Sequence, residues 1–376
     1  MRIAFLSVFY PFRGGISQFN ACVYRALEKT NEIRAFNFKR LYPGILFPGK
    51  TQFVNEEDSP DRIPSVQLLD SINPFSFSAT AKKIIHYKPD LLLMDFWLPF
   101  FAPEFGYIGK KLQKKGTAVI SILSNVIPHE KKIGDITLTK YFLNRNDGFI
   151  VLAESVIKDL LKLKPGAFFR KHPHPNYEHF GDKINKIKAR EILNIPEDKK
   201  VILFFGLIRK YKGLDLLIKS IGELPDDYFL LSAGEVYGDE KEYLDLIKST
   251  GIENRVMFIN RYISDNEVAP YFSAADVCVL PYRSATQSGI IGVAYHFGLP
   301  VITTDVGGLK EVIEPFGTGT VIPYADKELL KQSITEYFEN NLFDKYSSSI
   351  EKFKQNYTWD SFANEIIILF NELVRQ

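Results

Sequence analysis

The fold is decided by residues 201–218, which read VILFFGLIRKYKGLDLLI. The first five residues form an apolar run with branched and aromatic side chains, which predicts a buried strand that ends at Gly206. Apolar residues return at helical spacing directly after Gly213. A buried strand, a short loop and an amphipathic helix form the repeating unit of a parallel sheet that is covered by helices.

The same alternation extends over the whole chain of 376 residues. It predicts an α/β protein made of two similar halves, each built on a parallel sheet. The expected strands are residues 3–8, 33–38, 91–94, 118–123 and 149–152 in the first half, and 201–205, 229–232, 256–259, 277–280 and 301–303 in the second.

Breaks in this pattern predict the domain boundaries. Prolines and glycines in the stretch 165–195 predict a linker, and apolar residues at helical spacing predict a final helix over 359–374 with one buried face. We expect an N-terminal domain over residues 1–182, a C-terminal domain over 183–357, and a C-terminal helix over 358–376.

Composition and charge narrow the class of protein. Hydrophobic residues make up 45% and charged residues 24%, which indicates a folded globular protein and excludes disordered and fibrous classes. The two cysteines, Cys22 and Cys278, favour neither a disulfide framework nor a zinc site. No targeting signal and no spanning run of apolar residues is visible, so we expect a cytoplasmic protein.

The second half contains a basic loop after its first strand. Gly206 is followed by Arg209 and Lys212, a fork-shaped cation and a compact one. Ligands of parallel sheets bind beyond the carboxyl ends of the strands, so this pair is placed to neutralise a diphosphate. A solvated basic turn is the alternative reading.

Two more loops at the same edge suit an anion. Small residues precede the helix that is expected from about residue 290, where unpaired backbone amides attract negative charge. These residues are Gln287, Ser288 and Gly289, and a further tight loop follows at 304–308.

The first half has two weaker signals. Gly14 and Gly15 follow the first strand, where they allow a close approach to a ligand or form a plain tight turn. His129 stands beside Glu130 after the strand 118–123, and it either handles protons or lies on an ordinary surface.

Together these loops resemble glycosyltransferase family 4, the retaining glycosyl transferases of group 1 with the GT-B fold. The matching motifs are Gly14-Gly15, Phe205-Gly206 through Lys212-Gly213, Ala275-Asp276-Val277 through Pro281-Tyr282, and Gly298-Leu299-Pro300-Val301 through Glu311. A bacterial polysaccharide-type subgroup is indicated by the aromatic and basic segment 38–50, Pro128-His129-Glu130, and His174-Pro175 before Tyr177.

The resemblance implies two Rossmann-like domains that face each other across a cleft, with the C-terminal helix crossing back to the N-terminal domain. It implies a hexosyltransferase that moves a sugar from a UDP- or GDP-sugar, bound mainly by residues 183–357, to a glycan or lipid-linked acceptor, bound mainly by residues 1–182. It implies no cofactor, no metal and no nucleic acid.

The resemblance also implies roles for single residues. Arg209 and Lys212 would hold the leaving diphosphate, and His129 would act on the acceptor side. The nucleotide sugar would be bound by Gly14, Gly15, Gly206, Gln287, Ser288, Gly289 and Glu311.

The chain departs from the family pattern at several positions. The family commonly has two glutamates near Ala285 and Val293, and an arginine where this chain has Leu207. A catalytically silent GT-B protein that binds nucleotide sugar or scaffolds a complex therefore stays open, as does an epimerase or a phosphorylase on the same fold. A nicotinamide oxidoreductase is disfavoured because its glycine fingerprint is missing.

Residues 1–182 carry a net charge of +8 against −6 for the remainder. This basic half combines many aromatic residues with four lysines, Lys110, Lys111, Lys114 and Lys115. Such a surface suits docking on the anionic inner face of the plasma membrane, and core aromatics with a solvated lysine face are the equal alternative. The aromatic residues are Phe36, Phe38, Tyr42, Phe47, Phe75, Phe77, Phe96, Trp97, Phe100 and Phe101.

Overall fold

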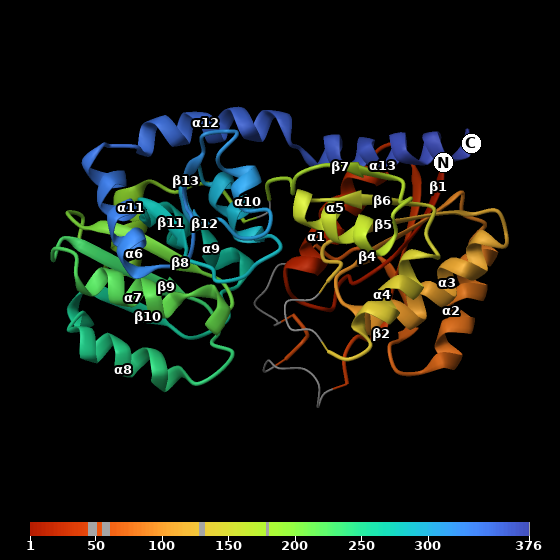
Figure 1. Ribbon diagram of the computed structural model, residues 1–376, viewed down its shortest axis with the longest axis horizontal. Helices are drawn as coiled ribbons and strands as arrows, with labels where there is room; N and C mark the ends of the chain where they lie inside the picture. Colours follow the sequence, from red (N-terminus) through yellow and green to blue (C-terminus); the bar gives the residue numbers. More distant parts are fainter. Residues whose placement is uncertain (44–50, 55–60, 128–131, 178–179, 376) are drawn as a thin grey trace. The chain divides into compact units, whose positions relative to one another are not determined.

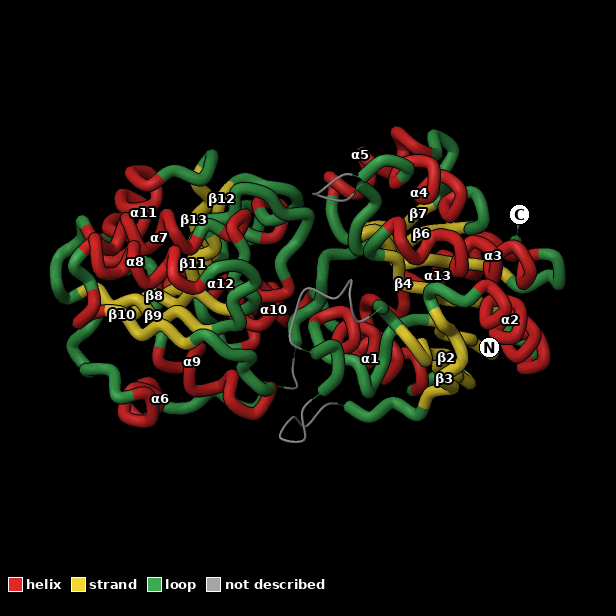
Figure 2. Tube along the Cα trace, turned by 90° about the horizontal axis from the view of Figure 1, so that it is seen from below, coloured by secondary structure: helices red, strands yellow, loops and turns green. Residues whose placement is uncertain are grey.

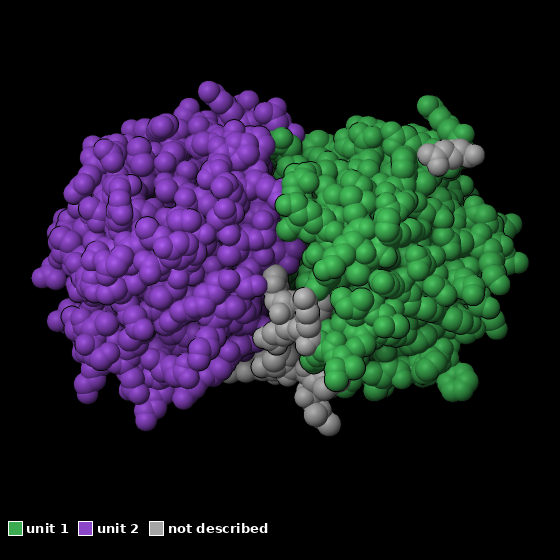
Figure 3. All heavy atoms as spheres, viewed as in Figure 1, with its two compact units in different colours: residues 1–56, 60–174, 357–376 green, residues 57–59, 175–356 purple. Residues whose placement is uncertain are grey.

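The computed structural model describes residues 1–43, 51–54, 61–127, 132–177 and 180–375. Contacts divide them into two compact units, which Figure 3 colours separately. The first unit holds the described residues up to His174 and those from Tyr357 onward, and the second holds those from Pro175 to Asn356. The chain thus passes from one unit to the other at His174, eight residues before the boundary that we expect from the sequence.

The first unit is built on a parallel sheet (Figure 1), which has seven strands in the described part of the chain. Its order is β3-β2-β1-β4-β5-β6-β7, so the chain starts in the middle and crosses over to both sides. The strands are β1 (Arg2–Leu6), β2 (Glu32–Arg40), β3 (Ser65–Asp70), β4 (Leu91–Phe96), β5 (Ala118–Leu123), β6 (Gly148–Val151) and β7 (Phe169–Lys171).

Helices cover both faces of this sheet. Connections between parallel strands are right-handed, so a reversal of the direction of crossing moves the helices to the opposite face. Accordingly α1 packs against α13, while α3 packs against both α2 and α4. The helices are α1 (Gly15–Glu28), α2 (Pro74–Tyr87), α3 (Ala102–Gln113), α4 (Asp135–Leu143), α5 (Glu154–Leu163) and α13 (Trp359–Val374).

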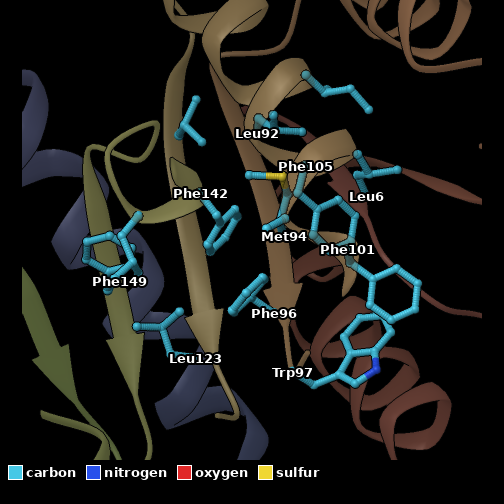
Figure 4. Packing of buried hydrophobic residues seen from close by; sticks show 14 of the residues in the cluster. Leu6, Leu92, Met94, Phe96, Trp97, Phe101, Phe105, Leu123, Phe142 and Phe149 are labelled. Carbon is cyan, nitrogen blue, oxygen red and sulfur yellow. The ribbon is translucent and has the colours of Figure 1, made fainter. Parts of the chain in front are cut away.

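The core of the first unit is aromatic (Figure 4). The rings of Phe96 and Phe142 stack with their centroids 4.0 Å apart, and those of Trp97 and Phe101 are 4.5 Å apart. Of the aromatic residues considered above for a membrane surface, six are buried, namely Phe36, Phe38, Phe77, Phe96, Trp97 and Phe101. Most of these rings therefore stabilise the fold, whereas Phe75 is exposed and Phe47 lies outside the described residues.

The final helix returns to the first unit, as the sequence predicts. α13 has the expected bounds and contacts α1, β5, β6 and β7. Phe362, Ile366 and Leu369 form its buried face, since apolar side chains three and four residues apart share one side of a helix. Lys29, the residue directly after α1, forms an exposed ion pair at 2.7 Å with Asp360 near the start of α13.

The second unit repeats the architecture of the first. Its sheet has the order β10-β9-β8-β11-β12-β13, and the described pairs are all parallel. The strands are β8 (Lys200–Phe205), β9 (Tyr228–Ala233), β10 (Val256–Ile259), β11 (Val277–Leu280), β12 (Val301–Thr304) and β13 (Gly319–Ile322).

Figure 2 shows this second sheet with helices on both of its faces. α7, α8 and α11 share one face, where they enclose a core cluster with β8 and β9. α9 packs with α6 on the other face, and α10 packs with α12. The helices are α6 (Lys186–Leu193), α7 (Leu214–Gly222), α8 (Glu240–Thr250), α9 (Val268–Ala274), α10 (Gly289–His296), α11 (Lys327–Glu339) and α12 (Phe343–Asn356).

The two parallel sheets and their helices confirm the predicted fold class. The stretch 165–195 differs from the expected linker, because it contains β7 and α6 in addition to irregular chain. Among the described helices, none is both long and apolar enough to cross a membrane.

Candidate functional site

Loops from four neighbouring strands meet at the carboxyl edge of the second sheet. They follow β9, β8, β11 and β12, which lie side by side and run in the same direction. Two glycines allow these loops to pack closely against one another. A side chain at Gly213 (φ +73°) would collide with the carbonyl of Pro281, and one at Gly307 (φ +56°) with that of Ala285. The basic loop 206–213 is therefore held against the loop after β11, and that loop against the one after β12.

Arg209 and Lys212 lie close together in this assembly. The Nζ atom of Lys212 lies 5.5 Å from the ring centroid of Tyr282, and the guanidinium of Arg209 lies 4.9 Å from that of Tyr237. Burial, and to a lesser degree the charge of Arg209, lower the pKa of Lys212 to about 8. In the described part of the chain neither cation forms an ion pair, so the two charges together favour an anionic ligand.

Gly206 lies beside this lysine. An added Cβ at Gly206 would be 3.8 Å from the Nζ atom of Lys212 and 3.1 Å from a methyl carbon of Ile290 in α10. The glycine, with φ +95°, therefore leaves room between the end of β8 and the start of α10. The structure thus brings Gly206 and Lys212 together at the start of that helix.

A third cation of this edge, Arg283, braces the basic loop. Its guanidinium forms two bonds to the carboxylate of Asp215, at 2.8 and 2.7 Å, and a third to the carbonyl of Lys210 at 2.8 Å. The backbone N–H of Arg283 donates to the carbonyl of Tyr211 at 2.7 Å. Arg283 thus holds the basic loop in place. Its charge is paired with the carboxylate of Asp215, whereas Arg209 forms no ion pair with a described residue.

The start of α10 presents polar groups at the same edge. Ser288 precedes the helix without capping it by its side chain, and its hydroxyl lies 3.3 Å from that of Tyr282. The Nε2 atom of Gln287 is buried and has no hydrogen-bond partner. Gly289 is the first residue of the helix, where backbone amides point outward with the positive end of the helix dipole.

The other expected site residues lie elsewhere. Gly14 and Gly15 are in the first unit, where Gly14 (φ +107°) precedes α1, and an added Cβ at either glycine would meet no atom within 4 Å. Glu311 lies in a single helical turn, Lys310–Val312, after the loop that follows β12. His129 lies outside the described residues.

A buried polar cluster lies at the carboxyl edge of the first sheet. The hydroxyl of Ser124 donates to Asp95 at 3.0 Å, and the amide of Asn20 donates to the hydroxyl of Ser7 at 2.8 Å. Burial raises the pKa of Asp95 to about 7, although hydrogen bonds from Ser124 and Asn20 oppose the rise. Ser124 therefore has a partner in the core.

The described residues contain no group of three or more His, Cys, Asp or Glu side chains that could hold a metal ion. The cations and the helix start can bind an anionic group such as a diphosphate. The sequence predicted no role for Tyr237 or Tyr282 beside the two cations, since their rings come from loops that are distant in the chain.

The two Rossmann-like units and the returning C-terminal helix define the GT-B fold of glycosyltransferases. Residues 185–357 match the family model described as Glycosyl transferases group 1. The match lies within the second unit, apart from its last residue, and includes all the loops of the site.

Curated relatives share part of the sequence. An uncharacterised glycosyltransferase of Methanocaldococcus jannaschii is 28% identical over 202 residues, which are 49% of this chain and 48% of the relative. The lipopolysaccharide core biosynthesis mannosyltransferase LpsB of Rhizobium meliloti is 24% identical over 209 residues, which are 53% of this chain and 59% of LpsB. The chain thus spans about half the length of the curated relatives it matches.

Solved structures share the fold over the whole chain. HepE of Anabaena in complex with UDP superposes with a TM-score of 0.77 at 14% identity, over 99% of this chain and 100% of HepE. WaaG, a glycosyltransferase involved in lipopolysaccharide biosynthesis, superposes with a TM-score of 0.66 at 18% identity, over 97% and 99% of the two chains.

Proposed function

We propose that this chain is a retaining hexosyltransferase that moves a sugar from a UDP- or GDP-sugar to a glycan or lipid-linked acceptor in surface polysaccharide or glycolipid synthesis. The observation that carries the proposal is the pair Arg209 and Lys212 at the carboxyl edge of the second sheet, two cations that form no ion pair with any described residue. HepE, which has the same fold, is known in complex with UDP and with UDP-glucose, and this supports a nucleotide sugar as donor.

The chemistry needs stabilisation of the leaving diphosphate. As the bond from the anomeric carbon to the phosphate oxygen breaks, negative charge grows on the diphosphate, and cations that are already in place lower the barrier. In the retaining mechanism that the resemblance implies, the acceptor hydroxyl attacks from the same face and its proton passes to the departing phosphate. The products are the nucleoside diphosphate and the glycosylated acceptor.

Other parts of the proposal rest on the resemblance. We assign the donor to residues 183–357 and the acceptor to residues 1–182, with His129 on the acceptor side. Arg209 and Lys212 supply the positive charge opposite the diphosphate, so we propose that transfer needs no added metal or cofactor. LpsB and WaaG are proteins of lipopolysaccharide synthesis, which supports a surface glycan as product.

A second candidate is a catalytically silent GT-B protein that binds nucleotide sugar. Ala285 and Val293 stand near the positions of the paired glutamates of the family, and neither side chain has a carboxylate that could contact a sugar. Such a protein would bind the donor at the same site without releasing diphosphate.

Turnover separates the two candidates. The protein is incubated with UDP-glucose, UDP-galactose or GDP-mannose in buffer with EDTA, with and without an extract of lipid-linked glycans, and released nucleoside diphosphate is measured. Release with one donor that increases with acceptor supports the transferase. Binding in calorimetry without release supports the silent protein, and neither binding nor release contradicts both.

A further inference from the structure

Asn176 is a buried amide side chain without a partner. It is 5% exposed, and within the part of the chain that the structure describes neither its Oδ1 nor its Nδ2 atom has a hydrogen-bond partner. Because both atoms are unpaired, exchanging the oxygen and nitrogen of the amide would not change this. Buried polar groups are nearly always paired, so an amide with donor and acceptor both open points to a missing ligand.

Described residues that follow Asn176 lie along α10 in the same chain direction as the helix. The next residue, Tyr177, lies at the start of α10, since an added Cβ at Gly289 would be 3.6 Å from its hydroxyl. Further along, the carbonyl of Gly181 lies 2.7 Å from Nε2 of His296, the last residue of the same helix. Asn176 precedes the residue at the helix start, which places it at the carboxyl edge of the second sheet.

A second unpaired amide lies at this helix start. The Nε2 atom of Gln287 is buried without a partner, two residues before Gly289. Ser288 leaves the helix without a side-chain cap. Two amide side chains that are far apart in the sequence thus have unpaired polar atoms at the same end of α10, close to the loop of Arg209 and Lys212.

The kind of polar atom that is unpaired, donor or acceptor, indicates which part of a ligand each amide side chain can bind. The oxygens of a diphosphate only accept hydrogen bonds, whereas a sugar hydroxyl both donates and accepts. The open NH₂ group of Gln287 suits any acceptor oxygen. Asn176 has both an acceptor and a donor to offer, which the diphosphate alone cannot satisfy and sugar hydroxyls can.

We propose that Asn176 binds hydroxyl groups of the glycosyl unit of the donor and so helps to decide which sugar is accepted. This inference rests on the proposed function, because it places the sugar beside the diphosphate at the start of α10. A site built to bond hydroxyls rejects ligands that lack them, since its own buried groups then stay unpaired.

The test is calorimetric titration of wild type, Asn176→Leu and Asn176→Ala with UDP and with UDP-glucose, and with GDP and GDP-mannose as a second pair. We expect the variants to bind the nucleotide sugar about tenfold or more weakly while the affinity for the nucleoside diphosphate changes by less than about twofold. Asn254→Ala is the matched control, because Asn254 is exposed and lies before β10, at the opposite edge of the sheet.

The melting temperature of the ligand-free variants is a second measurement. Replacing an unpaired buried amide by an apolar side chain of similar size removes a desolvation cost, so Asn176→Leu should melt at or above the temperature of wild type. A clear loss of stability in both variants would show that Asn176 supports the fold, and would overturn the proposal.

The remaining outcomes separate this inference from the proposed function. Equal loss of nucleotide and nucleotide sugar, or unchanged affinity for both, would overturn the role of Asn176 and leave the donor site in place. If wild type binds none of the four nucleotides, the proposed function fails and the inference fails with it.

Discussion

The Nζ atom of Lys212 lies 5.5 Å from the ring centroid of Tyr282, and these two residues come from loops after two adjacent strands, β8 and β11. The ring of Tyr282 is buried and supplies apolar surface next to the cation. Burial, and to a lesser degree the charge of Arg209, lower the pKa of Lys212, and no carboxylate among the described residues pairs with it. Charge that is partly removed from water attracts an anion more strongly than charge on the surface.

The first prediction concerns the two cations. We expect Arg209→Ala and Lys212→Ala each to weaken the binding of UDP or GDP by about ten- to a hundredfold, because charge-assisted hydrogen bonds contribute about 1.5–3 kcal/mol each. Both variants should melt like wild type. Lys210→Ala is the matched control from the same loop, because that side chain is exposed. Wild-type affinity in both cation variants would contradict the proposed diphosphate site.

The second prediction is a pH dependence of donor binding. A bound diphosphate favours the charged form of Lys212, so binding raises a pKa that is about 8 in the free protein. The affinity for UDP-glucose should therefore be constant below about pH 7 and fall as the pH rises through 8, by at most about tenfold per pH unit. UDP-glucose is the suitable probe because its diphosphate does not titrate in this range.

Calorimetry in two buffers of different ionisation enthalpy measures the same effect as proton uptake at pH 8.5. Lys212→Ala should show neither the fall nor the uptake. A flat profile in wild type would mean that Lys212 does not contact the donor charge.

The third prediction concerns the brace of the basic loop. The Arg283 guanidinium is bonded to the carboxylate of Asp215 and to the carbonyl of Lys210, so it holds the loop that carries Arg209 and Lys212. We therefore expect Arg283→Ala to weaken nucleotide binding several-fold. Because the pair is partly exposed, the free energy of unfolding should change by only about 0–1 kcal/mol. Asp215→Asn should have a similar effect on binding, and the double variant should add little to either single one. Additive losses would argue that the two residues act separately.

The fourth prediction concerns Asp95 in the first unit. Its pKa is about 7 in the folded chain against 3.8 as the ordinary value, so between these pH values the folded state keeps a proton that the unfolded state has lost. The stability of wild type should therefore fall as the pH rises, by about 1.4 kcal/mol per unit at most from this group.

Asp95→Asn removes this pH dependence of the stability, because the amide side chain stays neutral and still accepts the hydrogen bond from Ser124. In urea unfolding, the free energy of unfolding of the variant minus that of wild type should increase steadily from pH 4 to pH 7. Asp182→Asn, at an exposed aspartate, should run parallel to wild type over the whole range. Parallel curves for Asp95→Asn would show that Asp95 is charged in the folded protein.

The fifth prediction concerns membranes. Lys110, Lys111, Lys114 and Lys115 are exposed at the end of α3, next to the point where β5 begins. If the protein docks on anionic lipid, it should float with phosphatidylglycerol vesicles at low salt and lose this binding at high salt, since exposed charges are screened. A variant with glutamine at the four positions should not float. Wild type that shows no salt-sensitive flotation would contradict docking on anionic lipid.

The sequence by itself determined the interior of both units. Its apolar runs mark ten of the strands, and the spacing over 359–374 marks α13 with its bounds. The strands that it missed, β3, β7 and β13, all lie at the edge of a sheet. An edge strand has fewer neighbours to bury it, so it needs no long apolar run and leaves a weak signal.

The sequence also placed Arg209 and Lys212 after a strand, where a parallel sheet binds ligands. Only the tertiary structure decided which groups of that edge have partners. It pairs Arg283 with Asp215, leaves the two cations without a carboxylate, and buries Asn176 with both amide atoms open. Partners of this kind come from segments that are distant in the chain, and neither spacing nor composition records which of them meet.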